Sequence, residues 1–92
     1  MDVIDDKEAK RYEARVPGGI AFVDYRLRPD AIVLTHTEVP KESEGHGVGD
    51  RLVRFVLDDA RARGIGVVPV CPYVAEWIGR HPDYKDLVRA SG

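Results

Sequence analysis

The spacing of the apolar residues changes at Gly49, and this change constrains the fold more than any other feature of the sequence. From Arg11 up to the glycine-rich stretch, apolar and polar residues alternate, and a period of two is typical of half-buried strands. This change from a period of two to a helical period predicts strands first and an amphipathic helix afterwards. The helical positions after the switch are Leu52, Val53, Val56, Leu57 and Ala60.

Three alternating segments, residues 11–16, 20–27 and 31–39, are separated by short turns. The first turn contains Pro17, Gly18 and Gly19, and the second contains Arg28, Pro29 and Asp30. Proline fixes φ and aspartate can bond neighbouring backbone, so both stretches favour tight turns. Short turns between strands predict an antiparallel meander.

The helix is expected from about Val48 to Arg63, with Gly64 as its stop. The short apolar segment 66–70 reads as a buried strand, parallel to the third strand because a helix separates the two. Pro69 and Pro72 lack an N–H, so one edge of this strand is expected to stand open. A short helix and a turn or two should complete the chain.

The sequence predicts one domain, because 92 residues are too few for two hydrophobic cores. Its expected class is α/β (α+β): a mostly antiparallel sheet of about four strands, a parallel β-α-β step, one main helix and a short C-terminal helix. Residues 1–10 show no clear period and are expected to form a leading arm, with the domain over residues 11–92.

The charges argue against several classes of partner. The net charge is −2 and basic residues are mixed with acidic ones, so no basic patch for nucleic acid is expected. No apolar run approaches the roughly 20 residues that cross a bilayer, so no membrane partner is expected. A lone cysteine forms no internal disulfide, and the first ten residues lack the apolar run of a signal peptide, so we expect a cytoplasmic protein. A monomer or weak homodimer fits these features.

The stretch EGHGVGDRL places Gly45, Gly47 and Gly49 directly before the helix. Free N–H groups at a helix start carry partial positive charge and suit a phosphate, and glycines let it approach closely. A flexible loop with a helix cap remains the alternative. A Walker loop requires Lys-Ser/Thr where Asp50 and Arg51 stand, and a dinucleotide fold requires GxGxxG after the first strand of a βαβ unit. Neither pattern is present.

Four segments together resemble a known family: HTEVP at residues 36–40, EGHGVGDRLV, VPVCPYVAEWI and HPDY. They are similar to the compact single-domain GNAT superfamily of acetyl-coenzyme A dependent N-acetyltransferases, over roughly residues 11–88. The resemblance implies that the glycine turn holds the pyrophosphate of acetyl-coenzyme A and that the pantetheine arm lies beside residues 66–70. The expected cofactor contacts are Val39, Gly45, His46, Gly47, Val48, Gly49, Asp50, Cys71, His81 and Tyr84.

One residue departs from the family pattern. Glu44 stands where the superfamily usually has glutamine or arginine, and a carboxylate beside a pyrophosphate repels it. Unless Glu44 turns to solvent or pairs with Lys41 or Arg51, the affinity for coenzyme A should be modest.

Acetyl transfer to an amine requires a proton acceptor, because an alkylamine with a pKa near 10.4 is protonated at pH 7. Leu34, His36 and Glu38 are expected on one face of the third strand, just before the glycine turn. A histidine imidazole is mostly neutral at pH 7, so His36 is the first choice as base, with Glu38 acting directly, through water or by orienting the ring. A histidine bonded to nearby backbone is the alternative.

Cys71 precedes the C-terminal helix, whose amides would stabilise a thiolate able to carry the acetyl group. A small buried residue is the alternative role, and the superfamily usually transfers directly. His46, His81 and Tyr84 are solvent-exposed residues or cofactor contacts, and Trp77 reads as core. No histidine or cysteine pair has zinc-ligand spacing. Besides an enzyme, a non-catalytic coenzyme A-binding module or sensor, or a protein adaptor, fits the sequence.

Overall fold

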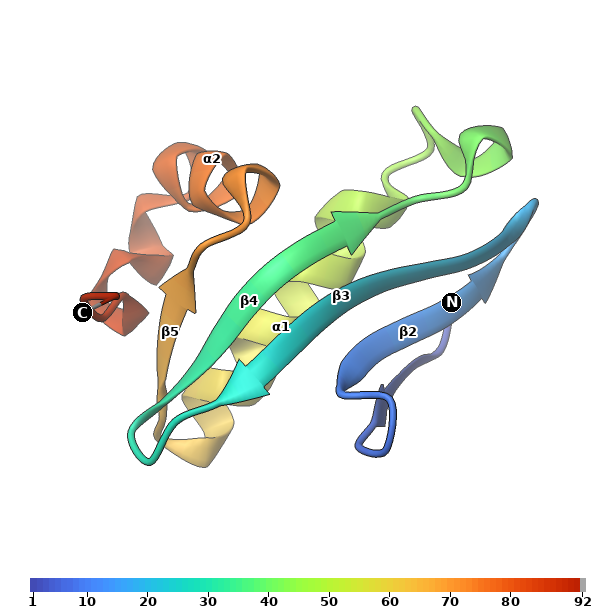
Figure 1. Ribbon diagram of the computed structural model, residues 1–92. Helices are drawn as coiled ribbons and strands as arrows, with labels where there is room; N and C mark the ends of the chain where they lie inside the picture. The colour runs from blue at the N-terminus through green and yellow to red at the C-terminus, as the bar shows by residue number, and fades with distance from the viewer. Residues whose placement is uncertain (92) are drawn as a thin grey trace.

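The computed structural model describes residues 1–91, so the last residue of the predicted domain, Gly92, lies outside them. It shows one five-stranded sheet in the order β1-β2-β3-β4-β5 (Figure 1). The first four strands are antiparallel and β4 and β5 are parallel, as predicted. The strands are β1 Val3–Asp6, β2 Arg11–Val16, β3 Gly19–Leu27, β4 Ala31–Glu38 and β5 Gly66–Pro69.

Helix α1, Val48–Arg63, connects β4 to β5 and packs behind the sheet in the view of Figure 1. Its bounds confirm the prediction from the helical spacing. A short 3₁₀ helix, η1 Lys41–Ser43, precedes it. The chain ends with α2, Pro72–Arg80, and the 3₁₀ helix η2, Pro82–Leu87, beside β5. No helix in residues 1–91 combines the length and apolar character needed to cross a membrane.

The expected leading arm contains the fifth strand, which corrects the count of about four. Val3 pairs with Ala14 and packs against the main core. The Tyr25 hydroxyl donates a hydrogen bond of 2.6 Å to Asp5, which fixes the strand to the sheet. Four residues with only one apolar side chain on the core face give too little periodicity to be read from the sequence.

The core lies between α1 and one face of the sheet. Leu52 and Leu57 of α1 are fully buried against Val23 and Leu34 of the sheet. Burying one such side chain stabilises the fold by about 1.5–3 kcal/mol. The opposite face of β2, β3 and β4 carries no helix among the described residues (Figure 1).

One residue of β4 has no partner on β3. Leu34 pairs with Tyr25, and His36 pairs with Asp24, the residue before Tyr25. Thr35 is therefore an additional residue that forms a β-bulge. An added residue shifts the alternation of side chains along a strand by one position.

The bulge separates two groups of residues that the sequence placed together. Thr37 pairs with the buried Val23 and faces α1, as Leu34 does. His36 and Glu38 face the other side of the sheet, which we call the open face. The prediction that Leu34, His36 and Glu38 share one face is wrong, because a period of two does not reveal an inserted residue.

β5 is the last strand of the sheet and has one open edge, as expected, and β4 has a second unpaired edge. β5 pairs with β4 on all four of its residues, and Val67 forms a bridge to Val88 on its other side. The pairing ends at Leu34, whereas β4 continues to Glu38. On its β5 side, β4 has no strand partner from residue 35 to 38 within residues 1–91, because the chain after β5 turns away into α2.

Candidate functional site

The turn between η1 and α1 presents free backbone amides. Gly45 and Gly47 have φ of 79° and 76°, a left-handed conformation that a side chain would strain. The first intrahelical bond of α1 runs from the Arg51 N–H to the Gly47 carbonyl, at 3.1 Å. Together with the helix dipole, amides that point out of the first turn suit an anion. At the start of α1, the amides of Gly47, Val48, Gly49 and Asp50 have no acceptor in the described chain.

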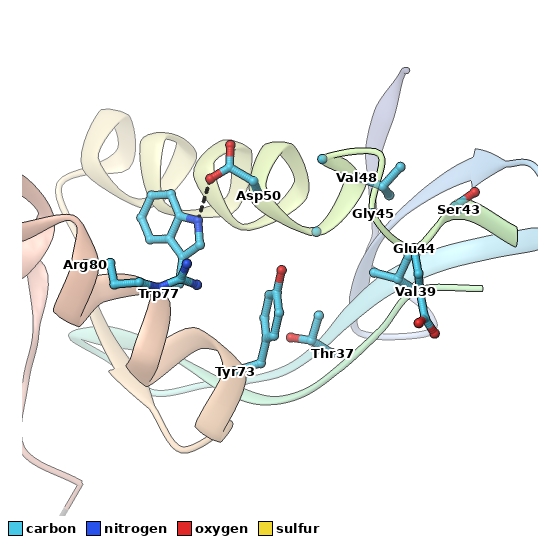
Figure 2. A pocket seen from close by; sticks show the side chains of 12 residues that line it. Thr37, Val39, Ser43, Glu44, Gly45, Val48, Asp50, Tyr73, Trp77 and Arg80 are labelled. Carbon is cyan, nitrogen blue, oxygen red and sulfur yellow. Dashed lines mark hydrogen bonds between the residues drawn. The ribbon is translucent and has the colours of Figure 1, made fainter. Parts of the chain in front are cut away.

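A cavity of about 450 Å³, which we call the turn cavity, opens from these amides toward α2 (Figure 2). The end of β4, including Thr37 from the unpaired stretch of that strand, forms one wall. The turn cavity is lined by Thr37, Val39, Ser43, Glu44, Gly45, Gly47, Val48, Gly49, Asp50, Tyr73, Trp77 and Arg80.

Most of the predicted cofactor contacts therefore come together in one cavity. Those that line it are Val39, Gly45, Gly47, Val48, Gly49 and Asp50. His46 is exposed on the other side of the turn, against a second cavity. His81 and Tyr84 do not line the turn cavity.

Tyr84 belongs to the core. Its hydroxyl donates a hydrogen bond of 2.7 Å to Asp58, its ring packs edge-on against Trp77, and the residue is buried. The hydrogen bond to Asp58 raises the pKa of Tyr84. His81 stacks on the Trp77 ring at 3.7 Å and bonds the Trp77 carbonyl through Nδ1.

Tyr73 was not predicted as a site residue, yet it lines the turn cavity (Figure 2). Its hydroxyl lies directly against Gly49, where a Cβ would overlap the oxygen. Burial raises the pKa of Tyr73, so its hydroxyl stays protonated and able to donate at neutral pH.

Trp77, which the sequence indicated as core, was also missed as a cavity residue, whereas Arg80 was expected with His81 and Tyr84 near the cofactor. Tyr73, Trp77 and Arg80 recur at i, i+4 and i+7 of α2, which places them along one side of the helix. This spacing is the signal that could have identified them. Val74, Trp77 and Ile78 form the buried side of the same helix and dominate its apolar pattern.

The Glu44 carboxylate points away from the first turn of α1 (Figure 2). Neither Lys41 nor Arg51 forms an ion pair with it in the described chain. Glu44 therefore reduces its repulsion of a pyrophosphate by pointing away from the amides and not by pairing with a cation.

His36 and Glu38 form a pair on the open face, with Nε2 3.0 Å from Oε2. Both side chains are more than half exposed, at 56% and 64%. The His36 ring lies 6.1 Å from the Phe22 ring, and the Arg11 guanidinium lies 4.7 Å from the same ring on its β2 side. The pair is therefore separated from the turn cavity by the thickness of β4.

Cys71 is buried at the start of α2, and its Sγ lies 3.5 Å from the Thr37 hydroxyl. Its N–H bonds the Leu34 carbonyl at 2.9 Å, at the point where β4 and β5 diverge. The thiol does not line the turn cavity, although Thr37 and Tyr73 on either side of it do.

The mixed sheet, the bulge in β4 and the glycine-rich turn that opens the crossover helix define a GCN5-related acetyltransferase fold. The chain belongs to this family: the model described as GCN5-related N-acetyl-transferase matches residues 11–87.

The structure is also similar to that of a GCN5-like protein from Staphylococcus aureus, determined by NMR in solution, with a TM-score of 0.76. The two chains are 20% identical, and the match covers 99% of this chain and 90% of the other. At this identity the likeness establishes the fold alone. A search among curated proteins found no match to this sequence.

Proposed function

We propose that the protein transfers an acetyl group from acetyl-coenzyme A to an amine. The observation that carries this proposal is the continuity between the free amides of the glycine turn and the unpaired stretch of β4. An elongated ligand with a diphosphate can rest on the amides while its thioester end extends along residues 35–38. The gap between β4 and α2 leads to the bulge, behind which His36 and Glu38 lie.

The residues present fit coenzyme A. The amides of Gly47 to Asp50 supply donors for the diphosphate, and Glu44 is oriented away from them. Thr37 and Val39 offer a mixed surface to the pantetheine arm, and Arg80 adds a cation at the α2 side. When bound, acetyl-coenzyme A would supply the activated acetyl group as a thioester.

The chain itself supplies proton transfer on both sides of the sheet. On the open face, His36 accepts the proton that an ammonium acceptor must lose, and Glu38 orients the ring through the 3.0 Å contact. On the cavity side, the protonated hydroxyl of Tyr73 can donate a hydrogen bond or a proton to the leaving sulfur. An acceptor that approaches from the open face and a cofactor in the turn cavity meet at the bulge.

An assay of acceptor-dependent release of free thiol tests this function. The protein is incubated with acetyl-coenzyme A and small amines, polyamines or peptides with free N-termini. His36→Ala should lower kcat/KM by about 10²–10⁴-fold, with the affinity for coenzyme A unchanged. Arg26→Gln, on the same face but outside the pair, is the matched control. Binding without release for every acceptor would instead establish a non-catalytic coenzyme A module.

Direct transfer fits the structure better than a Cys71 relay, because the thiol is buried and does not line the turn cavity. Rapid mixing with acetyl-coenzyme A alone separates the two routes. Direct transfer predicts no release of coenzyme A before the acceptor is added and no acetylated Cys71. A burst of free thiol with a thioester on Cys71 would establish the relay.

A further inference from the structure

A second cavity of about 400 Å³ lies on the other side of the glycine turn. It is enclosed by the turn between β2 and β3 and by the start of α1, which lie at the same end of the sheet (Figure 1). Val16, Pro17 and Val48 give it an apolar floor. Ser43 and Val48 line both cavities, so only the thickness of the turn separates them. We call it the arginine cavity.

Two arginines of the arginine cavity have no acidic partner. Within residues 1–91, no carboxylate lies within ion-pair distance of Arg15 or Arg51. The Arg51 guanidinium makes only a long contact, 3.4 Å, with the His46 carbonyl. Most other arginines are paired, namely Arg11, Arg28, Arg54, Arg61, Arg63 and Arg80.

The gathering of unpaired cations is unusual for this chain. The protein has a net charge of −2 and more acidic than basic residues, so partners are available for most guanidinium groups. Of the remaining arginines, Arg89 binds backbone carbonyls and Arg26 projects from the open face of β3. In the arginine cavity, Glu42 is the one acidic residue beside Arg15, Arg51 and the imidazole of His46.

This set of side chains fits a phosphate monoester. A guanidinium presents parallel N–H donors that match two phosphate oxygens, and two such groups can neutralise a dianion. The imidazole of His46 can add a third donor when protonated. The apolar floor beside the charges can contact a sugar or a base. It therefore suits a phosphate attached to a nucleoside better than a free, hydrated phosphate ion.

We propose that the arginine cavity holds the 3′-phosphate of coenzyme A while the diphosphate of the same molecule rests on the amides of the glycine turn. This inference rests on the proposed function. In coenzyme A the 3′-phosphate is separated from the diphosphate by one ribose, and the arginine cavity is separated from the amides by the turn alone. The unpaired arginines thus distinguish coenzyme A from ligands that lack the third phosphate.

The test compares coenzyme A with 3′-dephospho-coenzyme A by isothermal titration calorimetry. The intact protein should bind coenzyme A roughly 10–100-fold more tightly, since charge-assisted hydrogen bonds are lost with the phosphate. Arg15→Gln with Arg51→Gln should abolish this ratio by weakening coenzyme A alone. Arg26→Gln, which removes an unpaired arginine elsewhere, should leave both affinities unchanged.

Each other outcome overturns a different statement. Equal affinity for the two ligands would overturn the 3′-phosphate site while leaving the turn cavity intact. Failure of both to bind at millimolar concentration would overturn the proposed function itself. Inorganic phosphate that shifts the guanidinium NMR signals of Arg15 and Arg51 as strongly as coenzyme A does would show a general anion site and overturn the assignment to the nucleotide.

Discussion

The indole Nε1–H of Trp77 donates a hydrogen bond of 2.9 Å to Oδ1 of Asp50. This bond joins α2 to the first turn of α1, and therefore fixes one wall of the turn cavity relative to the other (Figure 2). Two further cationic or ionisable groups surround the same indole: the His81 ring stacks on it, and the Arg54 guanidinium lies 5.1 Å from its centre. Trp77 is thus both a core residue, as predicted, and a link between the two helices.

Loss of the Asp50 carboxylate should destabilise the protein. Asp50→Ala leaves a buried indole N–H without its acceptor, at a cost of about 1–3 kcal/mol. Urea denaturation followed by fluorescence measures the change, since Trp77 is the one tryptophan of the chain. Arg54→Gln is the control, because loss of its exposed ion pair with Asp50 and of its contact with the Trp77 ring should together cost no more than about 1 kcal/mol. Equal urea midpoints for Asp50→Ala and the intact protein would contradict this role.

The contact between Gly49 and Tyr73 predicts that Gly49→Ala changes the stability in opposite directions with and without the Tyr73 side chain. Alanine in place of glycine inside a helix is ordinarily stabilising, by about 0.5–1 kcal/mol. Gly49→Ala should instead destabilise the intact protein, because the new Cβ overlaps the Tyr73 hydroxyl. In a Tyr73→Ala background the same substitution should become stabilising. Thermal melts of the four proteins in this cycle give the answer, and a stabilising effect in both backgrounds would show that Tyr73 does not lie against Gly49.

The bulge predicts which positions of β4 tolerate charge. His36→Lys places a charge on the open face, near Asp24 and Glu38, and should change stability by no more than about 0.5 kcal/mol. Thr37→Lys places a charge on the half-buried face toward α1 and should destabilise by about 1–3 kcal/mol, since removing a charge from water without a partner is costly. Chemical denaturation of the two variants measures both effects. If β4 alternated regularly through Thr35, with no bulge, the order would be reversed.

The tyrosine hydroxyls predict a loss of stability at alkaline pH. Burial, with the hydrogen bond to Asp5, raises the pKa of Tyr25 from 10.0 to about 12. The unfolded chain therefore releases this proton before the folded one does. The stabilisation is present below about pH 10 and is lost between about pH 10 and 12, by an amount on the order of 2 kcal/mol.

Melting temperatures across this pH range test the tyrosine effect. Tyr25→Phe should make the decline shallower without abolishing it, because burial also raises the pKa of Tyr12, whose hydroxyl bonds Asp59. A decline unchanged by Tyr25→Phe would contradict the contribution of this residue.

Local patterns predicted much of the fold correctly. The spacing of Leu52, Val56 and Ala60 gave the helix, and the glycine before and after it marked its ends. The alternation in β2 and β3 gave two strands with the correct inward residues. The family resemblance gave the glycine turn, and the turn cavity gathers six of the ten residues predicted from it.

The errors arise where long-range geometry decides. The bulge at Thr35 depends on how β3 and β4 are paired, and no local pattern in β4 marks it. The spacing of Tyr73 and Trp77 on α2 indicates a cavity wall only when Gly49 and Asp50 of α1 are known to contact these two side chains. Tyr84 looked exposed in a charged segment, yet its ring completes the core beside Trp77.

The bulge at Thr35 also decides which face of the sheet each later residue of β4 points to. Any graft of β4 into another scaffold must let residue 35 bulge out of the ladder or leave it out, so that His36 stays on the face opposite to Leu34. If residue 35 instead took a regular place in the ladder, the imidazole and the carboxylate beyond it would exchange faces with Thr37, and two polar groups would enter the hydrophobic core under the sheet.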